Sequence, residues 1–346
     1  MSDASTASPH DLPLPTVHDL RRAADRIAPY VRRTPLLPLP ADGPGALGPD
    51  LWLKPEQLQR TGSFKLRGAT NVLATIDPSV RERGVVTHSS GNHGQAVACA
   101  AAAFGVPATV AIPEGAPRVK LERTRAWGAT VIRCANTAES RAEAARTAAE
   151  ATGATIVPPY DHPGIVSGQG TVGLEIVADL PDVANVLVPV GGGGLASGVA
   201  VALAELAPRA RLIAVEPREA GDVHDSLAHG ERRTWPAERT TSTVADGVRT
   251  QTVGALPWRI LRERLHAVVL VDDEELLDAA SWFPHFGRTV VEPTGALALA
   301  AWRRIRRGDA DGVTLANGPT VLIATGGNVD VEALTAFLTR PDPDRP

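Results

Sequence analysis

The feature that most constrains this chain of 346 residues is its alternation of short apolar runs with longer helical stretches. Short runs rich in valine, isoleucine and leucine are typical of buried strands. The helical stretches between most of them, such as 138–151 and 272–283, predict an α/β fold with parallel-rich sheets and helices on both faces. We expect strands at Leu51–Leu53, Gly84–Thr87, Ala108–Ile112, Thr130–Ile132, Thr155–Val157, Asn185–Val190, Leu212–Val215, Ala267–Val271 and Thr320–Ala324.

Length and charge restrict the class of partner. The chain is long enough for two lobes, and a formal net charge of −4 argues against nucleic acid or an anionic membrane as its main partner. Two uncharged runs, 94–113 and 183–204, are interrupted by glycine and proline, so neither predicts a membrane span. Cys99 and Cys134 form no C-x-x-C motif, and the first residues resemble no secretory signal. We therefore expect a cytoplasmic protein.

Glycine-bearing loops follow several of the expected strands, where ligands bind in open α/β sheets. The run Gly191–Gly194 stands before a helical stretch. It predicts either a tight turn between strand and helix or a phosphate cradle, because glycine lets backbone amides approach an anion closely. The same run matches the dinucleotide pattern G-x-G-x-x-G/A through Ala196, and Glu216 ends the next expected strand. An NAD-dependent oxidoreductase is therefore a distant alternative, because four successive glycines match this pattern by accident. The Pro/Gly-rich stretch 35–49 is expected to be a surface connection.

Lys65 stands in the first turn of an expected helix, after Gly62. A cation at this end of a helix opposes the macrodipole, and such a lysine is most often a surface residue. The functional alternative is an amine whose pKa is lowered by burial and by the local positive field. Nucleophilic and imine-forming lysines need such a pKa.

Four motifs in order resemble the fold-type II pyridoxal-phosphate enzymes, most closely the serine/threonine dehydratase and serine racemase family. They are Ser63-Phe64-Lys65-Leu66-Arg67-Gly68-Ala69, Ser89-Ser90-Gly91-Asn92-His93-Gly94-Gln95-Ala96, Gly191–Gly194 and Gly326-Gly327-Asn328. The resemblance extends from Arg33 to Asp330. It implies two α/β domains with the cofactor in the cleft between them, and a homodimer. The large domain would comprise residues 1–82 and 158–346, and a small inserted domain residues 83–157.

The resemblance also implies roles for individual residues. Lys65 would form the internal aldimine with pyridoxal 5′-phosphate, with Phe64 against the pyridine ring and Asn92 on its 3′-oxygen. The phosphate would be bound by Gly191, Gly192, Gly193, Gly194 and Leu195, the pyridine nitrogen would face Thr325, and Gly247 would lie at the pocket wall. The substrate would be bound by Ser89, Ser90, Asn92, His93, Arg141 and Thr250.

A divalent cation is implied by the segment from Glu216 to Asp222. Its two carboxylates and the carbonyl of Ala220 resemble the cation site of the family. Hard oxygen donors suit Mg²⁺ or Ca²⁺. The alternative for this segment is an acidic loop in solvent.

The implied activity is that of an ammonia-lyase, which dehydrates L-threonine or L-serine to a 2-keto acid and ammonia. Serine racemase is an alternative, because Ser90 stands where the racemases carry their second acid, whereas the loop with Tyr160 resembles that of the dehydratases. A 3-hydroxyaspartate dehydratase is another, because Arg141 could pair with a second carboxylate. A binding protein without activity is disfavoured, because Lys65 is retained beside an intact cofactor loop.

Overall fold

The computed structural model describes residues 12–89, 91–114, 116, 118–135 and 137–340. Every apolar run that we expected as a strand forms one, which confirms the α/β class. The stretch 35–49 differs from expectation, because it contains the two-residue strand β1 (Leu37–Pro38) and the core residue Leu39. A strand this short, containing a proline, leaves no alternating pattern to detect.

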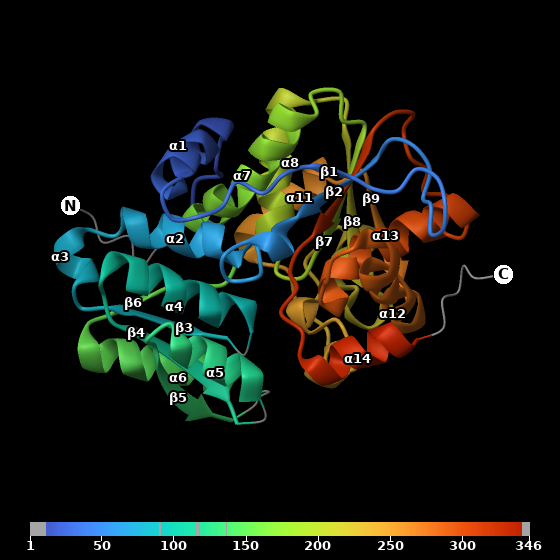
Figure 1. Cartoon of the computed structure of the whole chain (residues 1–346). Coiled ribbons are helices and arrows are strands. Elements are labelled where there is room, and N and C mark those ends of the chain that lie inside the picture. Colours follow the sequence, from blue (N-terminus) through green and yellow to red (C-terminus); the bar gives the residue numbers. More distant parts are fainter. Residues whose placement is uncertain (1–11, 90, 115, 117, 136, 341–346) are drawn as a thin grey trace.

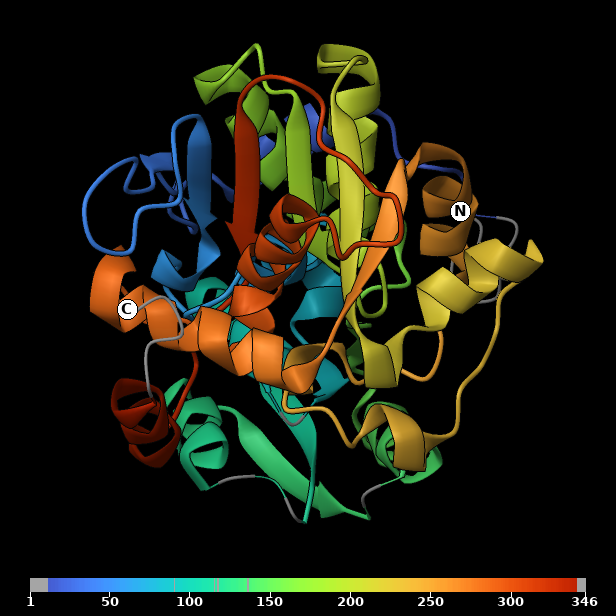
Figure 2. The same cartoon turned by 90° about the vertical axis from the view of Figure 1, so that its right-hand side faces the viewer.

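The larger sheet brings together strands from both ends of the chain. Its order is β1-β2-β10-β7-β8-β9, and all neighbours are parallel except β1 and β2. The strands span Leu51–Pro55 (β2), Thr320–Ala324 (β10), Asn185–Pro189 (β7), Arg211–Pro217 (β8) and Ala267–Val271 (β9). Figure 2 shows blue β2 directly beside red β10. Their carboxyl ends therefore meet at one edge, where the glycine-bearing loops begin.

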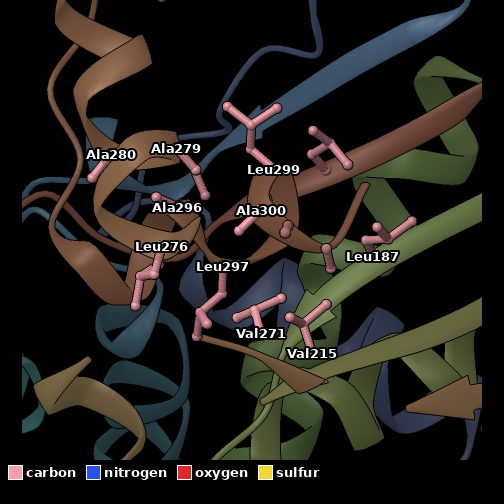
Figure 3. Close-up of a cluster of buried hydrophobic side chains, with 14 of the residues drawn as sticks. Leu187, Val215, Val271, Leu276, Ala279, Ala280, Ala296, Leu297, Leu299 and Ala300 are labelled. Atoms are coloured by element: carbon pink, nitrogen blue, oxygen red, sulfur yellow. The ribbon is translucent and has the colours of Figure 1, made fainter. Parts of the chain in front are cut away.

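Helices cover both faces of this sheet. On one face, α12 (Asp273–Trp282) and α13 (Pro293–Arg307) pack against strand residues such as Leu187, Val215 and Val271 (Figure 3). On the other face lie α7 (Pro163–Asp179), α8 (Gly194–Leu206) and α11 (Ala255–Arg264), with α1 (Val17–Ile27) packed against α7. Because both faces are buried, the central strands are apolar over most of their lengths, with polar residues near their ends.

The second sheet has the order β5-β4-β3-β6, and all its strands are parallel. It lies at the lower left of Figure 1. Helix α2 packs against both α4 and α7, and so joins this part of the molecule to the larger sheet. The elements here are α2 (Lys65–Thr75), α3 (Pro78–Arg81), β3 (Val85–His88), α4 (Asn92–Phe104), β4 (Ala108–Pro113), α5 (Arg118–Ala126), β5 (Thr130–Cys134), α6 (Ala138–Thr152) and β6 (Thr155–Ile156).

Short helices complete the described chain: α9 (Asp222–His229), α10 (Ala237–Thr240) and α14 (Val331–Thr339). Among the described residues, none of the helices combines the length and the apolar character that crossing a bilayer requires. Cys99 and Cys134 are both buried free thiols.

Candidate active site

Lys65 is the first residue of α2, and the end of β10 fixes its position. Ser63 forms an antiparallel bridge with Gly326, and the Phe64 amide donates to the Thr325 carbonyl at 3.2 Å. The Lys65 Nζ donates to the Pro159 carbonyl at 2.9 Å and lies 5.1 Å from the centroid of the Phe64 ring. Burial lowers the pKa of this amine to about 8. A substantial fraction is therefore neutral near physiological pH, as a nucleophile or base requires.

The four glycines form the turn between β7 and the N-terminus of α8. Gly193 has a φ of +88°, and a Cβ on Gly191 would lie only 2.9 Å from the Val248 Cα. A Cβ on Gly192 would overlap the Tyr160 ring, and one on Gly194 would lie 2.6 Å from the Gln169 Oε1. The first amides of a helix have no intrahelical partner and attract anions. The backbone amides of this turn, and that of the buried Leu195 after it, can therefore bind a phosphate group.

Two buried hydroxyls beside these loops have no hydrogen-bond partner within the described part of the chain. Thr325 directly follows the last residue of β10. It is 3% exposed, yet its Oγ1 has no hydrogen-bond partner among the described residues. The Thr250 Oγ1 is also unbonded, and it lies 3.2 Å from where a Cβ on Gly191 would be. Buried polar groups are normally hydrogen-bonded, so these two atoms point to a polar ligand in the site.

The loop after β3 lies near the same edge. Ser89 accepts a hydrogen bond from the Gly91 amide at 3.1 Å, while Ser90 lies outside the described residues. Asn92 opens α4, and its Oδ1 accepts from the Asn328 Nδ2 at 2.7 Å. His93 is 3% exposed; burial lowers its pKa to about 3, and the neutral ring donates from Nε2 to the Val157 carbonyl at 3.1 Å. The ring thus lies in the packed wall behind the loop.

Glu292 belongs to this site, and the sequence reading did not identify it. It is 2% exposed at the N-cap of α13, and its Oε1 accepts from the Asn92 Nδ2 at 2.6 Å. A Cβ on Gly326 would overlap the same carboxylate oxygen. The only pattern in the sequence that points to Glu292 is an acidic residue directly before Pro293, at the start of an apolar helix. Such a pattern predicts a helix N-cap as readily as an active-site residue.

The remaining residues predicted at the site surround the glycine turn. Gly247 lies in the 3₁₀ turn Asp246–Val248, and its amide donates to the Thr294 Oγ1 at 3.0 Å. Arg141, in the first turn of α6, lies close enough for its charge to act on His88 and Tyr160. Burial lowers the pKa of His88, and the Arg141 charge lowers it further. Arg141 therefore lies within electrostatic range of both the loop after β3 and the Tyr160 segment.

Glu216 and Asp222, which we call the acidic pair, are fully buried beside Ala220. The Glu216 carboxylate accepts from the amides of Val223 and His224 at 3.0 and 2.8 Å. Asp222 Oδ2 accepts from the Val253 amide at 2.7 Å, whereas its Oδ1 has no partner among the described residues.

Burial raises the pKa of both acidic-pair carboxyls, that of Asp222 to about 7, and the charge of Asp222 raises the pKa of Glu216 further. An unbonded carboxylate oxygen beside a second carboxylate suits a hard cation. The described residues contain no cluster of three or more His, Cys, Asp or Glu that could hold a metal, so a cation here also needs the Ala220 carbonyl and water. Glu216 is fully buried, so it presents no open surface to a ribose hydroxyl, which weakens the dinucleotide alternative.

Comparisons with known proteins agree with this geometry. The family described as "Pyridoxal-phosphate dependent enzyme" matches residues 27–326. An L-threonine ammonia-lyase of Geobacter sulfurreducens is 40% identical over 321 residues, which cover 93% of this chain and 77% of that protein. An L-threo-3-hydroxyaspartate ammonia-lyase of Pseudomonas is 39% identical, covering 94% of this chain and 99% of the relative. Maize serine racemase superposes with a TM-score of 0.87 at 37% identity, covering 94% of this chain and 97% of that one. The chain therefore belongs to the pyridoxal-phosphate dependent enzymes.

Proposed function

We propose that this protein is an ammonia-lyase that converts L-threonine and L-serine to a 2-keto acid and ammonia. One observation carries the proposal: a half-buried lysine, whose amine has a lowered pKa, lies at the edge where the glycine turn meets the Thr325 hydroxyl, which has no hydrogen-bond partner among the described residues. The relatives named threonine ammonia-lyase and hydroxyaspartate ammonia-lyase support this class of reaction.

The residues present fit the cofactor of the family. The amides of Gly191–Gly194 and Leu195 would hold its phosphate, Thr325 would bond its ring nitrogen, and Phe64 and Asn92 would flank its ring. When bound, the cofactor supplies the electron sink that makes the α-proton of an amino acid acidic. A hydroxyl cannot keep the ring nitrogen protonated as a carboxylate does, which favours elimination over transamination.

The protein's own groups then handle the proton and the substrate. Lys65 takes the α-proton at Nζ, which its lowered pKa permits because the neutral amine is accessible near pH 8. We propose that Ser89, Ser90 and Asn92, at the loop after β3, bind the substrate carboxylate, with the His93 ring packed behind them and Thr250 also at the substrate. Loss of the β-hydroxyl and hydrolysis of the released enamine give the keto acid and ammonia.

Lys65→Ala tests the proposal. Keto-acid formation from L-serine and L-threonine should fall to background, with the fold retained by circular dichroism. Reductive methylation followed by peptide mapping can report the reactivity of each lysine separately, because the chain has only three: Lys54, Lys65 and Lys120. Keto-acid production at the wild-type rate by Lys65→Ala would exclude Lys65 as the catalytic amine.

The choice between elimination and racemisation depends on Tyr160. Its ring covers Gly192, where a side chain on the glycine would overlap it. A ring in this position favours elimination over racemisation, because it fills space in the site beside the glycine turn. Chiral chromatography after incubation with L-serine should show pyruvate in large excess over D-serine. Substantial D-serine that disappears in Ser90→Ala would make racemase the better description.

Arg141 favours one second candidate, a 3-hydroxyaspartate ammonia-lyase. Its charge acts on Tyr160 beside the glycine turn, where it could pair with the second carboxylate of a dicarboxylic substrate. Comparison of kcat/KM for L-threo-3-hydroxyaspartate and L-threonine distinguishes the two. If hydroxyaspartate is preferred, Arg141→Ala should lose that preference and retain turnover of threonine.

We further propose that the acidic pair and the Ala220 carbonyl hold Mg²⁺ or Ca²⁺. The unbonded Asp222 oxygen supports this site. Isothermal titration of the metal-stripped protein should show binding that Asp222→Asn abolishes. We also propose a cytoplasmic homodimer, in which residues 83–157 form a small domain that closes on the remainder. Its two unpaired, buried thiols agree with a reducing compartment.

A further inference from the structure

The segment Pro159–Asp161, between β6 and α7, touches three different parts of the site through three successive residues. The Pro159 carbonyl accepts from the Lys65 Nζ at 2.9 Å. The Tyr160 ring lies against Gly192. Asp161 turns away from both toward the N-terminus of α11. A displacement of this segment would therefore disturb the lysine and the glycine turn together.

Asp161 is the fixed point of the segment. Its Oδ2 accepts from the Ala255 amide and its Oδ1 from the Leu256 amide, both at 2.9 Å. The N-cap of α11 is Gly254, which has no side chain to bond these first-turn amides. Asp161 thus supplies the missing cap from a distant part of the chain, with a negative charge at the positive end of the helix dipole.

The same turn also supports the glycine loop from the other side. The Gly254 amide donates to the Gly192 carbonyl at 3.1 Å. The N-terminus of α11 is therefore a common anchor: Gly254 holds Gly192, and the next two amides hold Asp161. This arrangement fixes Tyr160 relative to the glycine that its ring covers.

We propose that Asp161 is a positioning residue, which caps α11 and thereby holds the Pro159 carbonyl on the Lys65 amine and the Tyr160 ring on Gly192. The inference deepens the proposed function, since it concerns the orientation of the same lysine. Asp161 itself touches neither the amine nor the glycine turn, and acts only through its neighbours.

The test compares Asp161→Asn with wild type. An asparagine offers one acceptor oxygen instead of two, and its NH₂ group faces an amide donor. The first readout is acetylation of Lys65 in the cofactor-free protein across a pH series, followed by mass spectrometry of the Lys65 peptide. Lys65 should be half-reactive near pH 8 in wild type. Release of the segment admits water and should raise that midpoint by about one pH unit.

Other groups around the amine do not explain such a shift. His93, on α4, interacts electrostatically with Lys65, but its pKa of about 3 keeps it neutral throughout the pH series. Burial alone lowers the Lys65 pKa. The Lys54 peptide controls for unfolding in the same digest, because Lys54 is fully buried and paired with Glu175 and should stay unacetylated while the protein is folded.

The second readout is the separation of kcat from KM. Asp161→Asn should lower kcat for L-serine about tenfold or more, with a smaller change in KM, because misplacement of a catalytic amine affects the chemical step. Asp161→Glu keeps both acceptor oxygens and should recover part of the loss. Asp77→Ala removes a similar cap from α3, where Asp77 accepts from the Ser79 amide at 2.9 Å, and should leave both readouts unchanged.

An unchanged acetylation midpoint in Asp161→Asn overturns the inference, whatever the effect on kcat. Equal effects of Asp161→Asn and Asp77→Ala overturn it as well, because cap loss alone would then explain the result. The acetylation readout needs neither cofactor nor substrate. If wild type forms no keto acid from serine or threonine, the proposed function fails while the positioning of Lys65 by Asp161 is still tested.

Discussion

Two groups of buried charges in this protein are balanced in opposite ways. Lys54, Glu56, Arg67 and the half-buried Glu175, which we call the buried quartet, contain two cations and two carboxylates. Arg67 donates to both Glu56 oxygens at 2.8 Å and to Glu175 at 2.6 and 2.9 Å, and Lys54 donates to Glu175 at 2.6 Å. The acidic pair has two carboxylates, and only backbone amides bond them within the described residues.

The difference appears in the pKa values. Burial would raise the pKa of Glu56, but the Arg67 charge lowers it below its ordinary value. Burial raises the pKa of Asp222 to about 7 instead, and the charge of Arg232 offsets this rise only in part. A buried charge group that is complete within the chain indicates a structural role. A group that lacks its counter-charge indicates a ligand from solution.

The largest expected effect comes from disrupting the buried quartet, whose charges are balanced within the chain. Arg67→Met leaves Glu56 and Glu175 without their main partner and should lower the free energy of unfolding by about 3–5 kcal/mol. Urea denaturation of the cofactor-free protein measures this loss. Arg22→Met, which removes an exposed ion pair with Asp19, should cost less than about 1 kcal/mol. Similar losses in the two variants would contradict the structural role of the quartet.

The next largest effect comes from adding a cation to the acidic pair. Ca²⁺ at one hundred times its dissociation constant should stabilise the wild type by about 2.7 kcal/mol, because it binds only the folded state. Thermal unfolding with Ca²⁺ and with a chelator measures the difference. Asp222→Asn should abolish the response, whereas Arg67 variants that still fold should keep it. An equal response in Asp222→Asn would place the cation elsewhere.

Without the cation, Asp222→Asn should change stability in the direction opposite to Arg67→Met. In chelator at pH 8, Asp222→Asn should stabilise the protein by at least about 1 kcal/mol, because it removes a buried charge that raises the energy of the folded state. The asparagine can still accept from the Val253 amide. Denaturant midpoints for wild type and variant, measured together, decide the matter. A destabilised variant would show that the carboxylate is satisfied without a cation.

The smallest effect concerns the Thr325 hydroxyl, which, like the Asp222 Oδ1, has no hydrogen-bond partner among the described residues. Thr325→Val should weaken cofactor binding about five- to tenfold, the equivalent of one hydrogen bond, while leaving the cofactor-free protein as stable as before. Titration with pyridoxal 5′-phosphate, followed by absorbance, gives the affinity. Unchanged affinity would mean that the hydroxyl does not contact the cofactor.

Local patterns predicted the strands and the glycine turn, because their causes are local. Apolar runs such as 185–190 are buried on both faces wherever they pair. At Gly193, a positive φ excludes most other residues, and Lys65 opens its helix as expected. Strand β1 has too few residues to show a period.

Contacts between distant segments could not be predicted in this way. Asp161 caps a helix that begins 94 residues later, and Glu292 meets Asn92 across 200 residues. Neither neighbourhood is visible in the local sequence, since each depends on how two sheets are placed in space. The position of Tyr160 over Gly192 has the same origin: the loop was identified, but its packing partner was not.

The pairing of β10 with both β2 and β7 has a consequence for the order of assembly. Lys65 emerges early in synthesis, but the strand that supports its helix is residues 320–324, near the other end of the chain. Until that strand joins the larger sheet, β2 has no parallel neighbour. The sheet edge beside the Lys65 amine is then incomplete. Such long-range pairing slows folding and exposes unpaired edges while the chain is unfinished. The edge that carries Lys65 is therefore complete only after residues 320–324 have been made.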